Sequence, residues 1–135
     1  MMTLGRSGDD SLAERFARAL ASELKAVGIS LDFTPVLDIL TNPKNPAIGD
    51  RALAERADDV ARLGKRIITT LQQAGIAACG KHFPGHGDTS TDSHHELPLV
   101  EPDDMDDEGD LSLAMLQSPD VEVLVQKRGD SVADL

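Results

Sequence analysis

The feature that most constrains the fold is a unit of helix, glycine, isoleucine, short apolar strand and polar loop that occurs twice. The glycine–isoleucine steps, Gly28-Ile29 and Gly75-Ile76, stand 47 residues apart. The first opens the β-prone stretch "ISLDF", and the second opens "IAACGKHF". Strands that alternate with helices, and that are too apolar to be exposed on one side, predict a parallel α/β sheet buried on both faces.

The helix of each unit is predicted by apolar residues that recur with helical spacing. The first helix is expected at residues 11–27, which begin with a capping-box pair, Ser11 and Glu14. The second is expected at about residues 53–74. The two apolar stripes are Leu12, Phe16, Leu20 and Leu24, and then Val60, Leu63, Ile67 and Leu71. We expect a glycine to end each helix, because glycine readily adopts the left-handed conformation found there.

The acidic charge of the chain is confined to its C-terminal part. The formal net charge is −11, yet residues 1–100 carry 11 Lys/Arg against 13 Asp/Glu, while residues 101–135 carry 2 against 11. No cluster of Lys or Arg is present, which excludes nucleic acid and anionic membranes as expected partners. Residues 101–110 predict a solvated linker, and residues 121–125 predict a possible strand.

Cysteine content and hydropathy bear on the cellular compartment. The single cysteine, Cys79, has no internal disulfide partner, and we expect it to be a small apolar core residue. No apolar run approaches the length of a membrane span, and the first ten residues lack the apolar core of a signal peptide. The chain is therefore expected to be cytoplasmic, with the proviso that a chain without its own N-terminus would also lack its signal.

All four histidines lie in one stretch, "GKHFPGHGDTSTDSHHELP", at residues 80–98. Lys81 and His82 stand where the second strand should end, and in parallel α/β folds active-site groups gather at that end of the strands. Asp92 precedes His94 by two residues, so its carboxylate can orient one ring nitrogen and leave the other for proton transfer. The alternative is that Asp92 caps a turn and His94 is an ordinary solvated loop residue.

A metal site is a further alternative, because the same stretch is rich in ligand types. These are His82, His86, His94, His95, Asp88 and Asp92. The four-residue spacing of the first two histidines is interrupted by proline and glycine, which excludes the helix that would make it a zinc signature. We therefore predict no metal and no cofactor.

The string "KHFPGHGDTSTDSHHELP", together with "DFTPVLDI" and "IGDRAL" upstream, resembles the N-terminal catalytic domain of family 3 glycoside hydrolases, in the β-N-acetylhexosaminidase branch. The resemblance covers about residues 3–100. It implies a (β/α)8 TIM barrel that removes terminal β-linked N-acetylglucosamine with retention, often in peptidoglycan recycling. Residues 1–100 would then be part of the catalytic barrel, and residues 101–135 a divergent acidic tail.

The resemblance also implies roles for individual residues. Arg51, Lys81 and His82 would bind hydroxyl groups of a small saccharide substrate. Asp92 and His94 would form the catalytic dyad that protonates the leaving oxygen and later activates water. A retaining mechanism needs one such group that first gives and then takes a proton. We expect the three sugar-binding residues to line one pocket at the strand ends.

The sequence departs from the family pattern in its length and in its carboxylates. A complete barrel takes about 250 residues, so 135 residues provide about half of one. No Ser/Thr-Asp-Asp-like motif supplies a nucleophile, and we interpret Asp38 and Asp50, in the earlier loop, as backbone-bonding turn residues. A truncated gene, a frameshift and a recombined end would each produce such a chain.

Two further functions remain open: a non-catalytic sugar-binding or interaction fragment, and a metal-dependent hydrolase. We also expect weak or no turnover by this chain alone. Half a barrel leaves sheet edges and apolar strand surface uncovered, which predicts self-association.

Overall fold

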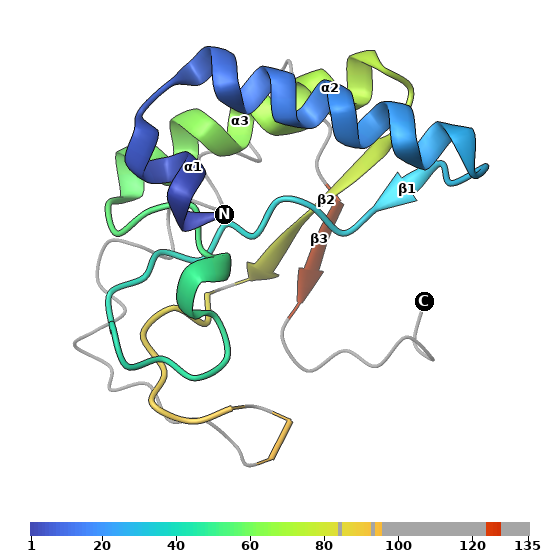
Figure 1. The fold of residues 1–135 in the computed structure, drawn as a ribbon. Helices are drawn as coiled ribbons and strands as arrows, with labels where there is room; N and C mark the ends of the chain where they lie inside the picture. Colours follow the sequence, from blue (N-terminus) through green and yellow to red (C-terminus); the bar gives the residue numbers. More distant parts are fainter. Residues whose placement is uncertain (84, 93, 96–123, 128–135) are drawn as a thin grey trace.

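The computed structural model describes residues 1–83, 85–92, 94–95 and 124–127 (Figure 1). Along the chain the elements are α1 (Met2–Ser7), α2 (Asp10–Ala26), β1 (Leu31–Asp32), η1 (Gly49–Arg51), α3 (Ala57–Gln73), β2 (Ala77–Phe83) and β3 (Leu124–Lys127). None of the helices in the described part of the chain is long and apolar enough to cross a membrane.

The strands form a parallel sheet in the order β1-β2-β3. Leu31 is paired with Ala77 on β2, and Cys79 is paired with Leu124 on β3. The prediction of a parallel α/β arrangement is therefore confirmed. β3 begins at Leu124 and overlaps the end of the strand predicted at 121–125, whose first three residues lie outside the described part. The linker predicted at 101–110 also lies outside it.

The two helix–glycine–isoleucine steps have the same geometry, which confirms the repeated unit. Gly28 and Gly75 have φ angles of 80° and 81°, in the left-handed region that favours glycine. In each step the glycine N–H donates to the carbonyl three residues earlier, and the isoleucine N–H donates to the carbonyl five residues earlier. Both helices thus end in a Schellman-type turn that directs the chain into a strand.

The start of α2 differs from the prediction. Asp9, not Ser11, is the cap, and its Oδ1 accepts hydrogen bonds from the backbone N–H groups of Ser11 at 2.8 Å and Leu12 at 3.3 Å. The Ser11 hydroxyl and these N–H groups lower the pKa of Asp9. Glu14 is consequently not part of a capping box, and it pairs with Arg66 on α3 at 3.2 Å. Asp9 stands earlier in the chain, so the helix begins one residue before its predicted start.

The core lies between the helices and the sheet, and α2 and α3 lie together on one side of β1 and β2 (Figure 1). The predicted stripe of α3 is completely buried. On α2 the buried stripe is instead alanine, at Ala13, Ala17 and Ala21. The predicted leucines and Phe16 of α2 are only partly buried and pack at the margin of the core. Alanines leave room for close contact with the neighbouring helix, a feature that the apolar spacing alone did not indicate.

The prediction that each strand is buried on both faces is wrong for β1. Val27, the C-cap of α2, is exposed, as are Ile29, Leu31 and Phe33. The last three alternate along the chain as residues on one face of a strand do. We call these four side chains the β1 stripe. β1 is the edge strand of the described sheet, so no further strand pairs with it among the described residues.

Candidate functional site

The loops that follow β1 and β2 meet at the carboxyl ends of these parallel strands (Figure 1). Beyond β1 the pairing continues, because the Leu37 N–H donates to the Lys81 carbonyl at 2.5 Å and the Lys81 N–H donates to the Pro35 carbonyl at 3.2 Å. These two hydrogen bonds hold Lys81 at the end of β2 directly against the loop after β1.

A first histidine–aspartate pair joins the two loops. The side chain of Asp38 is 0% exposed, and its Oδ2 lies 2.7 Å from Nδ1 of His82, whose side chain is 22% exposed. The same oxygen accepts a hydrogen bond from the His82 backbone N–H at 3.2 Å, and Oδ1 accepts one from the His86 backbone N–H at 2.5 Å. Two backbone N–H groups and the His82 ring thus surround a carboxylate that would be costly to bury without partners.

The prediction that Asp38 bonds backbone is confirmed, but it does not lie in a turn. The N–H groups that it accepts from are 44 and 48 residues away, on β2 and the loop after it. The sequence signal was its position in the apolar run "PVLDIL", where a charged residue must have buried partners. Which partners it finds depends on strand pairing across the sheet, which the local sequence does not contain.

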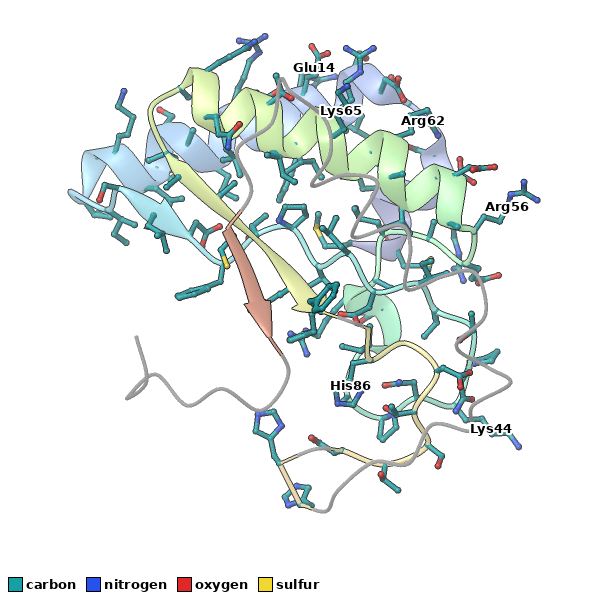
Figure 2. The ribbon with its side chains drawn as sticks, turned by 180° about the vertical axis from the view of Figure 1, so that it is seen from behind. Glu14, Lys44, Arg56, Arg62, Lys65 and His86 are labelled. Carbon is teal, nitrogen blue, oxygen red and sulfur yellow. The ribbon has the colours of Figure 1, made fainter. Side chains whose placement is uncertain are left out.

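A buried polar cluster fixes the loop after β2. The Asn45 side-chain amide donates to the carbonyls of His86 at 2.6 Å and Thr89 at 2.9 Å, while its oxygen accepts from the Ile48 N–H at 2.7 Å. Nδ1 of His86 lies 2.5 Å from Oγ1 of Thr89, and all three polar side chains are buried. Figure 2 shows His86 between the loops that follow β1 and β2. Sequence reasoning considered His86 only as a possible metal ligand and did not identify Asn45 or Thr89.

Backbones of the two loops also touch at Gly87. A Cβ atom placed on this residue would lie 1.6 Å from the carbonyl oxygen of Ile39, far inside contact distance. The Asn42 N–H donates to the Gly87 carbonyl at 3.3 Å. Only glycine leaves space for this approach, so the residue is required by packing rather than by its φ angle.

A second histidine–aspartate pair, Asp92 and His94, lies farther along the loop after β2. Oδ1 of Asp92 is 2.7 Å from Nδ1 of His94 and also accepts a hydrogen bond from the His94 backbone N–H at 2.9 Å. Their side chains are 28% and 83% exposed. The backbone N–H and the ring of His94 lower the pKa of Asp92. Asp92 thus makes both of the contacts that were predicted as alternatives. It caps the turn by accepting from the His94 backbone N–H, and it contacts the His94 ring.

The remaining predicted sugar-binding contacts are only partly defined. Lys81 Nζ lies 5.6 Å from the centre of the Phe33 ring, on the β1 stripe. Arg51, in η1, donates from Nη1 to the carbonyl of Ala47 at 2.8 Å. Within the described residues no hydrogen bond or ion pair joins Arg51 to Lys81 or His82. That the three line one pocket therefore stays a prediction.

The metal alternative receives no support in the described part of the chain, where no group of three His, Cys, Asp or Glu side chains is arranged to hold a metal ion. His82 and His86 do approach each other, with ring centres 6.1 Å apart in an edge-on arrangement. Their Nδ1 atoms face Asp38 and Thr89 respectively. Both rings are thus oriented by different neighbours rather than toward one shared centre.

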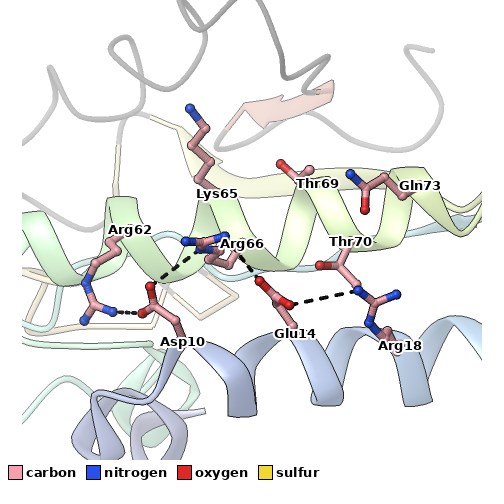
Figure 3. A pocket seen from close by; sticks show the side chains of 9 residues that line it. All are labelled: Asp10, Glu14, Arg18, Arg62, Lys65, Arg66, Thr69, Thr70 and Gln73. Carbon is pink, nitrogen blue, oxygen red and sulfur yellow. Dashed lines mark hydrogen bonds and ion pairs between the residues drawn. The ribbon is translucent and has the colours of Figure 1, made fainter.

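A groove of about 570 Å³ lies elsewhere, between α2 and α3 (Figure 3). It is lined by Asp10, Glu14, Arg18, Arg62, Lys65, Arg66, Thr69, Thr70 and Gln73. Its two acidic residues form ion pairs with arginines, including Arg66 with Asp10 at 3.5 Å. None of its residues belongs to the loops at the strand ends, so it is a charged helix–helix seam and not the candidate site.

Comparison with known proteins gives a consistent result. Residues 1–113 match the glycosyl hydrolase family 3 N-terminal domain. A beta-hexosaminidase of Bordetella pertussis is 49% identical over 88 residues, which are 65% of this chain and 25% of that protein. The Beta-hexosaminidase A of Pseudoalteromonas piscicida is 42% identical over 94 residues, 70% of this chain and 16% of that protein.

Solved structures show the same likeness. A family 3 β-N-acetylglucosaminidase from Paenibacillus superposes with a TM-score of 0.83 and 42% identity, covering 93% of this chain and 25% of that one. NagZ from Neisseria gonorrhoeae, solved in complex with N-trifluoroacetyl-D-glucosamine, has a TM-score of 0.79 and 33% identity, covering 93% of this chain and 39% of that one. The chain thus spans less than half the length of each of these relatives.

Proposed function

Because the chain belongs to the glycosyl hydrolase family 3 N-terminal domain family, we propose that it carries the acid/base group and sugar-binding residues of a retaining β-N-acetylglucosaminidase. The substrate would be a saccharide with a terminal β-linked N-acetylglucosamine. The relatives named beta-hexosaminidase and the N. gonorrhoeae structure with a glucosamine derivative support this substrate class.

The fold that we propose is about half of a (β/α)8 barrel. Three parallel strands in chain order, two of them preceded by helices of the same length and closure, are the units from which such a barrel is built. The superposition on the Paenibacillus enzyme supports the same arrangement. The candidate residues would then lie on the catalytic face of the barrel, where the loops after the strands meet.

The observation that carries the proposed mechanism is the contact between Nδ1 of His94 and Oδ1 of Asp92 at 2.7 Å. The lowered pKa of Asp92 keeps its carboxylate ionised, so that it accepts a hydrogen bond from Nδ1–H and leaves Nε2 as the nitrogen that exchanges protons. In the first step Nε2–H of the charged ring would protonate the leaving glycosidic oxygen. In the second step the neutral Nε2 would take a proton from the water that attacks the glycosyl–enzyme bond.

The nucleophile of such a reaction is the part that we do not assign to this chain. A retaining enzyme needs a carboxylate about 5 Å from its acid/base group. Asp38, the buried carboxylate at the strand ends, is fully engaged by the N–H groups of His82 and His86. We therefore propose that the chain by itself turns over glycosides negligibly.

Sugar binding would be the task of Arg51, Lys81 and His82. A lysine ammonium and a guanidinium donate to hydroxyl oxygens, and the imidazole can either donate or accept. Lys81 and His82 stand at the end of β2, and Arg51 ends η1 in the preceding loop. A non-catalytic sugar-binding fragment, which needs only these three residues, is the second candidate function. The high exposure of His94 favours it, because an acid/base group works best where water is excluded.

A chromogenic N-acetylglucosaminide separates both of these functions from a metal-dependent hydrolase, and a histidine variant of a full-length relative tests the acid/base role. We expect the purified chain to bind the compound without turnover, in the presence or absence of a chelator. Loss of an activity on chelation would instead indicate a metal-dependent hydrolase. In a full-length relative, replacing the histidine aligned with His94 should lower kcat strongly and leave the substrate affinity nearly intact. Loss of affinity alone would contradict the acid/base role.

We also propose that the β1 stripe mediates self-association. Four exposed apolar side chains beside an edge strand are a site at which another copy can bury both apolar surface and strand edge. Size-exclusion chromatography should show dimers or larger species for the wild-type chain. Leu31→Lys should shift the protein toward monomer, while the same change at an exposed polar site, Ser30→Lys, should not. A wild-type monomer at all concentrations would contradict this proposal.

A further inference from the structure

The carboxylate of Asp38 contacts Nδ1 of His82, so Nε2 is the ring nitrogen that is left for a ligand. The Asp38 side chain is completely buried, whereas the His82 side chain is 22% exposed. One end of the imidazole therefore meets a fixed protein group, and the ring as a whole reaches the surface of the candidate site. The two ring nitrogens have different environments.

The proton on His82 can be placed from the donors around Asp38. The backbone N–H groups of His82 and His86 can only donate, and both donate to this carboxylate. A carboxylate accepts, so Nδ1 of His82, at 2.7 Å from Oδ2, takes the same role and carries the proton. Nε2 is then the bare nitrogen of the neutral ring.

We propose that Asp38 is a positioning residue that fixes His82 as the Nδ1–H tautomer and thereby makes Nε2 a hydrogen-bond acceptor for a saccharide hydroxyl. This rests on the proposed sugar-binding role of His82. The hydroxyl must donate to the ring, while Lys81 beside it can only donate to a hydroxyl oxygen. His82 would therefore accept from one sugar hydroxyl, and Lys81 would donate to another. Opposite hydrogen-bonding roles at two neighbouring residues orient a sugar ring as well as attract it.

The frame around Asp38 makes this orientation rigid. On one side, residues 35–37 are hydrogen-bonded to Lys81 as a continuation of the sheet. On the other side, Oδ1 of Asp38 holds the backbone of His86, whose carbonyl accepts from the buried Asn45 amide. One carboxylate therefore links the end of β2 to the loop that carries Asp92 and His94.

The test is the ring ¹⁵N spectrum of the complete 135-residue chain, in which the Nδ1–H and Nε2–H tautomers of each histidine give distinct signals. For wild-type protein at a pH where the ring is neutral, we expect His82 to show protonated Nδ1 and bare Nε2. A predominant Nε2–H tautomer would overturn the proposal without any variant being needed.

Asp38→Asn provides the second measurement. The amide can donate to Nδ1, so His82 should shift toward the Nε2–H tautomer, and affinity for N-acetylglucosamine should fall about tenfold. Asp50→Asn, at an exposed aspartate of η1, is the matched control and should change neither. A folded Asp38→Asn chain with an unchanged His82 tautomer would overturn the proposal. If the tautomer shifts and N-acetylglucosamine binds neither protein, the positioning role stands and the sugar-binding function fails.

Discussion

The two histidine–aspartate pairs have the same contact distance and opposite surroundings. His82 and Asp38 are separated by 44 residues in the chain, and the carboxylate is completely buried. His94 and Asp92 are two residues apart; the His94 ring is 83% exposed and the Asp92 side chain 28%. In the first pair the Asp38 carboxylate is held by N–H groups of His82 on β2 and of His86 on the following loop. It is therefore fixed in place and can orient the His82 ring. In the second the partner is local and the ring meets solvent, so it can exchange a proton. Burial, not distance, separates the positioning pair from the pair proposed for catalysis.

The sharpest difference between the pairs should be in stability. Asp38→Ala leaves the His82 ring and two backbone N–H groups without their acceptor in a buried place, and should lower the free energy of unfolding by about 3–5 kcal/mol. Asp92→Ala should cost much less, because His94 is largely exposed and water can replace the carboxylate as its partner. Urea unfolding followed by circular dichroism measures both. Equal losses for the two variants would remove the distinction between the pairs.

The loop between the pairs depends on Gly87. In Gly87→Ala the added methyl would meet the Ile39 carbonyl oxygen, and we expect a loss of about 1–3 kcal/mol as the loops separate. Ser90→Ala, at an exposed position of the same loop, is the control. It should cost less, about 0.5 kcal/mol or below. If Ser90→Ala destabilised the chain as much as Gly87→Ala, the close approach to Ile39 would not be the constraint.

The smallest effect concerns the titration of the exposed pair. Because the pKa of Asp92 is lowered in the folded chain, its hydrogen bonds to His94 stabilise the fold above the ordinary value of 3.8. That contribution is lost as the pH falls through the lowered pKa. Carboxyl ¹³C NMR should therefore give Asp92 a midpoint below 3.8. A midpoint at or above 3.8 would mean that His94 does not hold the carboxylate in solution.

Much of the framework could be predicted from the sequence because its signals are local. The glycine after each helix sets its own φ angle, and the apolar stripe of α3 recurs with the period of the helix, so Gly28, Gly75 and the buried face of α3 were all predicted correctly. The predicted cap at Ser11 was wrong because Asp9, one position before the helix, accepts from the N–H groups of Ser11 and Leu12 and caps the helix there.

The site was less accessible to sequence reasoning. The contact between Asp92 and His94 spans two residues and was recognised from their spacing. The roles of Asp38, Asn45 and Thr89 depend on contacts across more than 40 residues, which exist only once β1 and β2 are paired. The exposure of the β1 stripe likewise depends on what packs beside β1. The apolar composition of a strand does not indicate its neighbours.

The central claim is that a saccharide binds at the carboxyl ends of β1 and β2, where both pairs are attached. The most direct test is a titration of the complete chain with N-acetylglucosamine, followed by backbone amide NMR. We predict shifts at Arg51, Lys81 and His82, reduced in Lys81→Ala, with no shifts at Arg62 and Arg66 in the groove between α2 and α3. Shifts confined to that groove, or no shift at any residue, would contradict the account.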